Sequence, residues 1–190
     1  MCGARVSFPL TGCRRKKGFT LLELVIVVAI ISVLSAIAVP AFSSIYGEFR
    51  LKATVREFKD LFRDAKLLSI QEKPCAILFD PGKGTATLVS GKGADEEWGT
   101  GDESVVRTMA LPDGISFGYG GRGPLKGCIA AEDGVSFKYN RFACLTGITG
   151  DLGAVYLQNQ SGDAMAVTVN SGEFNLGVYK WSGGAWADMK

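Results

Sequence analysis

The sequence contains no histidine among its 190 residues. This absence excludes Ser-His-Asp and Cys-His catalytic sets as well as histidine-ligated metal sites. No other group of residues forms a convergent catalytic pattern, so an exported enzyme is the least favoured function. We expect a protein that is not an enzyme and that uses no cofactor.

Negative charge is absent from the first 18 residues, which hold five basic side chains, four of them in the run Arg14 to Lys17. The rest of the chain carries 16 basic and 19 acidic residues, a net charge of −3. A domain that wraps nucleic acid usually needs a basic face of several charges, so this balance argues against such a role. The length suits one domain with an additional targeting or anchoring element.

Cysteine is scarce, and only Cys75, Cys128 and Cys144 follow residue 18. Three is an odd number for a domain in an oxidising compartment. A bridge between Cys128 and Cys144, with Cys75 as a buried thiol, is one arrangement open to an exported domain, and spacing alone does not establish it.

Charge is also nearly absent from the segment after the basic run. From Leu24 to Val39 the only polar side chains are Ser32 and Ser35. With residues 19–23 added, the segment has the ~20 residues that a membrane-spanning helix needs. The basic residues before it predict a cytoplasmic N-terminus, with the chain after Pro40 on the far side of the membrane.

Apolar side chains recur at helical spacing over residues 41–72. They are Ile45, Phe49, Leu51, Val55, Phe58, Leu61, Phe62, Ala65 and Leu68. Because Pro40 can kink a helix without ending it, we expect one helix from Phe19 to about Ile70. Its half at 19–40 spans the membrane and its half at 41–72 is amphipathic. A secreted soluble domain, cut by signal peptidase after Ala38, is the alternative that this continuity disfavours.

The text Gly18-Phe19-Thr20-Leu21-Leu22-Glu23, between a basic leader and an apolar helix, resembles the type IV pilins and the pseudopilins of type II secretion. In that family a prepilin peptidase removes the leader after its glycine and methylates the new amine. The resemblance implies that residues 1–18 are the leader, that the cut falls between Gly18 and Phe19, and that the helix is retained.

The single acid of this helix, Glu23, then has an implied partner. A lone ionised side chain within a spanning helix costs roughly 2 to 3 kcal/mol on insertion scales, and a nearby opposite charge offsets much of that. The resemblance implies an assembly salt bridge in which Glu23 of one subunit pairs with the Phe19 amine of the next. The alternative is a tolerated acid whose side chain reaches the membrane interface.

After residue 73 the apolar period shifts toward 2, with turn-forming residues between the runs. The β-rich runs are 76–79, 86–89, 104–109, 115–117, 135–139, 154–157, 166–169 and 174–181. They predict an antiparallel β-sheet domain over 73–190 that packs on the apolar stripe of the helix, an α+β, pilin-like fold. The C-terminal text, from 135–137 through 153–157 and 166–169 to a tryptophan-bearing strand, is most similar to the GspH/FimT branch of minor pilins and pseudopilins.

Three further motifs could indicate a ligand site, but each has a simpler structural interpretation. Gly118 to Gly123 matches GxGxxG, but no βαβ unit surrounds it, and a loop is favoured over a dinucleotide site. The acids at 95–97 and 102–103 lack the spacing of a calcium loop, so a solvated acidic loop is favoured. Some FimT-branch proteins bind DNA through a Gly-Arg-x-Arg stretch, which reads Gly172-Glu173-Phe174-Asn175 here. Edge aromatics are favoured over a remaining nucleic-acid patch of Lys180, Trp181, Trp186 and Lys190.

The resemblance implies a structural subunit of a type IV pilus or a type II secretion pseudopilus. Its implied partners are other pilin or pseudopilin subunits, prepilin peptidase, an inner-membrane assembly platform and, before assembly, membrane lipid. The implied location is the bacterial inner membrane as a single-pass protein, with the C-terminal domain periplasmic or extracellular, and then the filament. A DNA-uptake minor pilin is the alternative within the same system.

Overall fold

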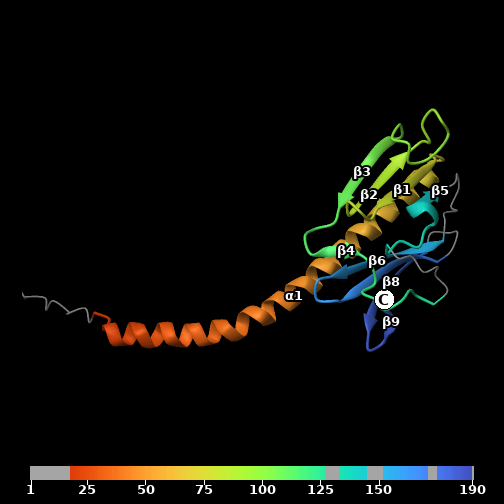
Figure 1. Cartoon of the computed structure of the whole chain (residues 1–190). Coiled ribbons are helices and arrows are strands. Elements are labelled where there is room, and N and C mark those ends of the chain that lie inside the picture. The colour runs from red at the N-terminus through yellow and green to blue at the C-terminus, as the bar shows by residue number, and fades with distance from the viewer. Residues whose placement is uncertain (1–17, 127–132, 145–151, 171–174, 190) are drawn as a thin grey trace, which may run out of the picture. The chain divides into compact units, whose positions relative to one another are not determined.

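The computed structural model describes residues 18–126, 133–144, 152–170 and 175–189 (Figure 1). The chain divides into two compact units, Met1–Ala41 and Phe42–Lys190. The helix α1 (Leu21–Ile70) contributes to both units and ends where the apolar periodicity predicts.

Nine strands follow the helix within the described residues. They are β1 (Cys75–Asp80), β2 (Thr85–Ser90), β3 (Ser104–Ala110), β4 (Ile115–Phe117), β5 (Arg141–Cys144), β6 (Gly153–Asn159), β7 (Ala164–Val169), β8 (Leu176–Ser182) and β9 (Ala185–Asp188). A short 3-10 helix, η1 (Lys138–Asn140), leads directly into β5.

The strands form two antiparallel sheets within the second unit (Figure 1). The four-stranded sheet has the order β3-β2-β1-β5, and the five-stranded sheet has the order β4-β6-β7-β8-β9. Every pairing between named strands of the described chain is antiparallel. The predicted α+β class, with antiparallel strands after a long N-terminal helix, is therefore confirmed.

The core joins both sheets to the second half of α1. The ring of Phe58 lies 5.9 Å from that of Phe117 on β4 and 6.4 Å from that of Phe79 on β1, measured between centroids. One turn later, Phe62 lies 5.1 Å from Phe142 on β5 in an edge-to-face arrangement. Aromatic side chains of this size dominate core energetics, so these rings hold the helix against the two sheets.

The apolar stripe of the helix is buried from Leu51 to Ala65 and partly buried at Leu68, as the periodicity predicts, but its first two members are exposed. Ile45 and Phe49 are 52% and 65% exposed. Near Ile45 and Phe49, the β6–β7 turn approaches the helix at Gly47, on a different side from these two side chains. The approach is close, because a Cβ on Gly47 would lie 3.3 Å from Asn159 Nδ2. The turn covers the glycine and leaves the apolar side chains uncovered.

The run at 135–139 does not form the predicted strand. Val135 makes an isolated bridge to Val155, and Ser136 N–H donates to Ala154 O at 2.9 Å, so the segment begins against the five-stranded sheet. Positive φ angles at Tyr139 and Asn140 then turn the chain away. It continues as β5, which pairs with β1 in the other sheet and was not predicted.

The closing strand predicted at 174–181 is present as β8, and a further strand that was not predicted, β9, follows it and completes a hairpin. β8 and β9 pair with Trp181 opposite Trp186, and the turn lies at Gly183 and Gly184, both of which have positive φ. The turn residues are evident in the sequence. β9 is only four residues long and mostly exposed, so it lacks the alternation of apolar and polar residues that identifies a strand.

Candidate functional site

The first turn of α1 is capped by a side chain. Thr20 precedes the helix, and its Oγ1 accepts a hydrogen bond from the backbone N–H of Glu23 at 3.2 Å. Its carbonyl accepts the N–H of Leu24 at 3.1 Å. The residues Thr20-Leu21-Leu22-Glu23 thus have the sequence of a capping box, with the acid at the third helical position.

The position of Glu23 in the first turn of the helix gives its carboxylate a favourable local environment that the sequence reasoning missed. A carboxylate in the first turn of a helix is stabilised by the partial positive charge of the helix N-terminus. The sequence pattern Thr-x-x-Glu carries the signal for this position. The side-chain carboxylate itself makes no hydrogen bond or ion pair with any residue that the structure describes.

The bond between Gly18 and Phe19 lies just before the helix. Both residues are exposed, Phe19 to 71%, and neither belongs to a helix or strand. The local geometry therefore leaves this peptide bond accessible. Residues 1–17, which are all of the predicted leader except Gly18, lie outside the described part of the chain.

The segment Leu21–Ala38 is long and apolar enough to cross a membrane, by length and composition. None of it is buried within its own unit, and side chains such as Ile37 are 70% exposed. Its polar Ser32 is satisfied within the helix, because its hydroxyl donates to Val28 O at 2.8 Å. An apolar surface of this extent needs lipid or other protein to cover it.

A second group of exposed apolar side chains lies on α1 at the start of the second unit. It consists of Phe42, Ile45, Tyr46 and Phe49. Their spacing of three and four residues places them on neighbouring parts of one helical face. This group, which we call the uncovered stripe, is a second apolar surface that the described residues leave exposed.

Charged side chains connect the helix to the five-stranded sheet next to the uncovered stripe. The Glu48 carboxylate accepts from Lys180 of β8 and forms an ion pair with Lys52 at 2.9 Å. The hydrogen bond from Lys180, followed by the one from Lys52, lowers the pKa of Glu48 from 4.5 to about 2. Lys180 is thereby engaged in holding the sheet to the helix.

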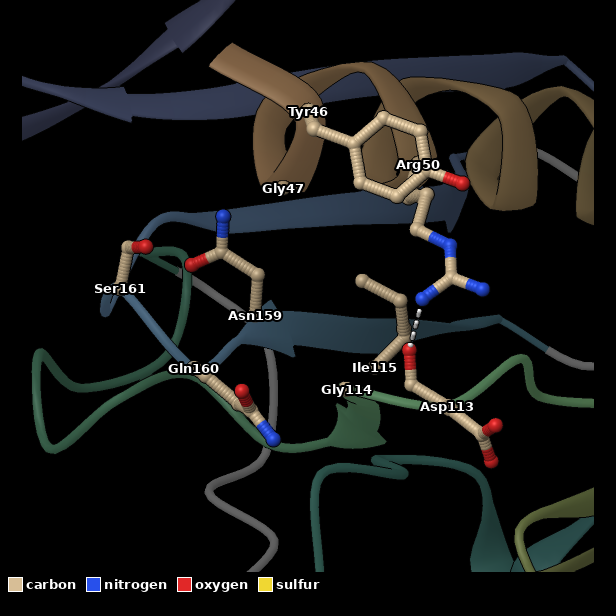
Figure 2. Close-up of a pocket in the computed structure, with 9 residues that line it drawn as sticks. All are labelled: Tyr46, Gly47, Arg50, Asp113, Gly114, Ile115, Asn159, Gln160 and Ser161. Atoms are coloured by element: carbon tan, nitrogen blue, oxygen red, sulfur yellow. Dashed lines mark hydrogen bonds between the residues drawn. The ribbon is translucent and has the colours of Figure 1, made fainter. Parts of the chain in front are cut away.

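On the opposite flank, a polar pocket of about 240 Å³ lies between α1 and the loops before β4 and after β6 (Figure 2). Arg50 reaches across it, and its Nη1 donates to the backbone carbonyl of Asp113 at 2.7 Å. The guanidinium also lies 5.2 Å from the ring centroid of Tyr46. Asn159 in the wall is held by Asp163, whose backbone N–H donates to Asn159 Oδ1 at 2.8 Å. These contacts position the helix, and no nucleophile and base are paired in the pocket lining.

The exposed face of the helix separates its charges. Lys52, Arg56 and Lys59 line a groove of about 260 Å³ that borders the five-stranded sheet. On the side of the four-stranded sheet, Asp64 forms an ion pair with Arg107 of β3 at 3.0 Å. The face thus has a basic edge and an edge with paired charges, a pattern that favours defined orientations of a neighbour.

The GxGxxG motif lies in a loop that covers the outer face of the five-stranded sheet. No helix begins in it, and the indole N–H of Trp186 donates to Gly123 O at 3.2 Å. Trp186 also packs 5.4 Å from Trp181, and Arg122 lies 5.8 Å over the Trp181 ring. These tryptophans are engaged at the sheet edge. Residues 171–174 and Lys190 lie outside the described residues.

The acidic loop uses its carboxylates to fix its own backbone. Asp102 Oδ2 accepts from Ala94 N–H at 2.7 Å, and Glu103 Oε2 accepts from Gly101 N–H at 3.0 Å. The hydroxyl of Thr100 and then the Ala94 N–H lower the pKa of Asp102. Among the described residues, no group of three or more His, Cys, Asp or Glu side chains is arranged to hold a metal ion.

The predicted disulfide joins Cys128 to Cys144. Cys144 is buried at the end of β5, and Cys128 lies outside the described residues. The residue opposite Cys144 across the sheet is Cys75 of β1. The predicted bridge between Cys128 and Cys144 therefore stays a prediction.

Comparison with known proteins gives three results. A family model described as the prokaryotic N-terminal methylation motif matches residues 13–39. Two proteins named fimbrial protein, both from Pseudomonas aeruginosa, are each 30% identical to this chain over 129 residues, covering 64% of this chain and 84% of the relative. The minor pseudopilin EpsH from the type 2 secretion system of Vibrio cholerae is similar in structure, with a TM-score of 0.46 and 11% identity, over 68% of this chain and 95% of EpsH.

Proposed function

Because this chain belongs to the type IV pilin family, whose members carry the N-terminal methylation motif, we propose that it is a minor pilin or pseudopilin of the GspH/FimT branch. Proteins of this family are structural and not enzymes. The subunit would assemble into a type IV pilus or a type II secretion pseudopilus through packing of its N-terminal helix.

The observation that carries this proposal is the uncovered apolar helix with one carboxylate in its first turn. The segment Leu21–Ala38 is entirely exposed in its own unit, so it is suited first to lipid and then to packing against equivalent helices. Close-packed helices exclude water, and in such an environment an ionised group requires an opposite charge nearby. Glu23 supplies the charge that would make such packing specific.

Processing would create the complementary charge. Cleavage between Gly18 and Phe19 turns the Phe19 nitrogen into an amine, which remains cationic after methylation. That cation would stand beside the partial positive charge of the helix N-terminus, an unfavourable arrangement for a chain by itself. The Glu23 carboxylate of a neighbouring subunit would relieve it, so the pairing favours assembly over the isolated subunit.

Retention of the helix defines the proposed location and partners. Before assembly the subunit would be a single-pass inner-membrane protein with a cytoplasmic N-terminus and residues 42–190 outside the cytoplasm. Prepilin peptidase and an inner-membrane assembly platform would act on this form. The uncovered stripe and the basic edge of α1 would then contact neighbouring subunits, with the β-rich unit available for cargo or for other subunits.

The experiment is an intact-mass and N-terminal sequence measurement on the protein extracted from membranes. A start at Phe19 with one added methyl group is the expected result. A start at Val39 would show that signal peptidase releases a soluble domain, and it would reject both membrane retention and assembly. The matched control is the same chain expressed without prepilin peptidase, which should keep residues 1–18 and stay out of filaments.

A further inference from the structure

Two cysteines from distant parts of the chain face each other inside the second unit. Cys75 opens β1 and Cys144 closes β5, and the antiparallel register pairs these two residues directly. Both side chains are buried, with exposures of 0% and 1%. The thiol of Cys75 donates to the carbonyl of Ala65 on α1 at 3.3 Å, and that of Cys144 lies 4.0 Å from the same oxygen. Both sulfur atoms therefore occupy one small region between the helix and the edge of the sheet.

The backbone geometry of this pair suits a covalent bond. Directly opposed residues of an antiparallel ladder have Cα atoms about 4.5 to 5.5 Å apart, and disulfides span Cα separations of about 4.4 to 6.8 Å. The two side chains also point to the same face of the sheet, as opposed residues do. A hydrogen bond from Cys144 lowers the pKa of the Cys75 thiol, with burial acting in the opposite direction. The two thiols are thus in contact, and bridging them needs no change of strand register.

We propose that Cys75 and Cys144 form a disulfide in the exported protein, joining β1 to the edge strand β5. This inference rests on the proposed export of residues 42–190, because disulfides persist in oxidising compartments and not in the cytosol. It makes Cys128 the cysteine without a disulfide partner among the three that follow residue 18, in place of Cys75.

The chemistry is a thiol–disulfide exchange with a protein or small-molecule disulfide of that compartment. The Cys75 thiolate attacks one sulfur of the donor, which breaks the donor bond, releases one donor thiol and leaves a mixed disulfide. The Cys144 thiolate then attacks the Cys75 sulfur and displaces the second donor thiol. The protein loses two electrons and two protons, and the donor gains them as two thiols.

Burial determines when this step occurs. With both sulfurs inaccessible in the folded unit, an oxidant reaches them before β5 docks or when it opens. Among the described residues β5 is an edge strand that pairs only with β1. The bond would therefore fasten this edge strand to the sheet, and once formed it would be protected from reduction by the same burial.

The test uses the full-length protein in two arms, each with free thiols blocked by N-ethylmaleimide before digestion without reductant. One arm is protein taken directly from membranes. The other is purified protein in detergent, reduced, denatured and refolded in a buffer of oxidised and reduced glutathione. In both arms we expect a cross-linked peptide pair joining Cys75 to Cys144, with Cys128 alkylated.

The two arms separate the pairing from the location. A bond between Cys128 and Cys144, or alkylated Cys75 and Cys144 after refolding in glutathione, overturns the proposed pairing. Formation of the bond in glutathione but reduced thiols in the membrane arm supports the pairing and rejects the proposed export of this unit.

Thermal unfolding provides an independent measurement. Closure of a loop of about 70 residues predicts that protein reduced while denatured, and then refolded in reductant, has a Tm roughly 10 °C below that of the oxidised protein. Cys128→Ser is the matched control and should keep this reductant-dependent shift. Cys75→Ala and Cys144→Ala, two replacements suited to buried sites, should each abolish it. A shift that survives in both alanine variants, or that disappears in Cys128→Ser, contradicts the inference.

Discussion

Lys180 of β8 donates a hydrogen bond to Glu48 of α1, a residue 132 positions earlier in the chain. Lys52, one turn further along the helix, forms an ion pair with the same carboxylate. The contact joins the helix to the five-stranded sheet at the place where the buried part of the apolar stripe begins. Its strength depends on the charge of Glu48, so it is sensitive to acid.

The first prediction concerns acid stability. Because folding lowers the pKa of Glu48 from 4.5 to about 2, the ion pairs stabilise the fold above pH 4.5 and lose their effect as the pH falls toward 2. The side chain is 35% exposed, and solvent screening limits the contribution to about 1 kcal/mol. Glu48→Gln should therefore lower the free energy of unfolding at pH 7 by about that amount and flatten its decline between pH 4.5 and 2, as measured by urea titration.

A double-mutant cycle provides the control for this prediction. If Lys180 is the principal partner of Glu48, Lys180→Met should reproduce most of the loss, and the double variant should be little worse than either single variant. Fully additive losses would show that the two side chains do not act as a pair. An unchanged acid slope in Glu48→Gln would show that another group controls stability in this pH range.

The second prediction compares two phenylalanines of the same helix. Phe58 is fully buried and packs against rings from both sheets, whereas Phe49 is 65% exposed. Phe58→Ala should lower the free energy of unfolding by about 3 to 5 kcal/mol, because it leaves a cavity in the core. Phe49→Ala should leave Tm within about 2 °C of wild type and instead reduce entry into filaments. Normal assembly of Phe49→Ala would remove the uncovered stripe as a contact surface.

The third prediction concerns Gly134, at the start of the segment that runs from the five-stranded sheet to β5 of the four-stranded sheet. Gly134 has φ +80°, and a Cβ there would lie 2.2 Å from the backbone nitrogen of Gly118. Gly134→Ala should therefore destabilise the fold by more than about 2 kcal/mol, since backbone atoms must shift. The matched variant Gly121→Ala has a similar φ of +69° and nothing within 4 Å, so it should cost about 1 kcal/mol from backbone strain alone. Equal losses of Tm in the two variants would contradict the close approach at Gly134.

The fourth prediction separates the two roles of Glu23. In a capping box either Glu or Gln is suitable at the third helical position, so Glu23→Gln keeps the local cap while removing the charge. If Glu23 pairs with the Phe19 amine of a neighbour, both Glu23→Gln and Glu23→Ala should reduce incorporation into filaments more than about tenfold, because an unpaired buried charge is left behind. The measurement is the ratio of filament-associated to membrane-associated subunit, taken after both variants are shown to be processed at Phe19.

A different result would identify capping as the role. Near-normal assembly of Glu23→Gln, together with failure of Glu23→Ala, would mean that the side chain is needed for hydrogen bonding, as in a capping box, and not for its charge. Thr20→Ala serves as a further control, because it removes the cap acceptor and leaves the carboxylate in place. Under the pairing hypothesis its loss of assembly should be smaller than that of Glu23→Gln.

Much of the fold could be predicted because its signals are local. The end of α1 at Ile70 follows from the loss of the helical period, and the burial of Leu51, Val55 and Phe58 follows from their spacing. The strands β1, β2 and β3 were found because each is a short β-rich run between turns. In each case neighbouring residues alone carry the information.

The features that the sequence did not predict depend on contacts between residues far apart in the chain. Residues 135–139 have the composition of a strand, yet only Val135 bridges the five-stranded sheet. The η1 helix then turns the chain toward the four-stranded sheet. β5 is short and has no distinctive period, and it exists because β1 offers it an edge. At the candidate site, the exposed Phe49 was indistinguishable by sequence from the buried Phe58, since both fit one helical stripe.

By itself the sequence determined the apolar helix, the motif around Gly18 and Glu23, and the α+β order of elements, because helix period, charge and turn chemistry act between residues close in the chain. Only the tertiary structure decided which part of the helix stripe is covered, that Lys180 meets Glu48, and that Cys75 faces Cys144. Those relationships depend on which strands pair and in what register. That choice is made by the packing of the whole core around Phe58 and Phe62, which no local pattern specifies.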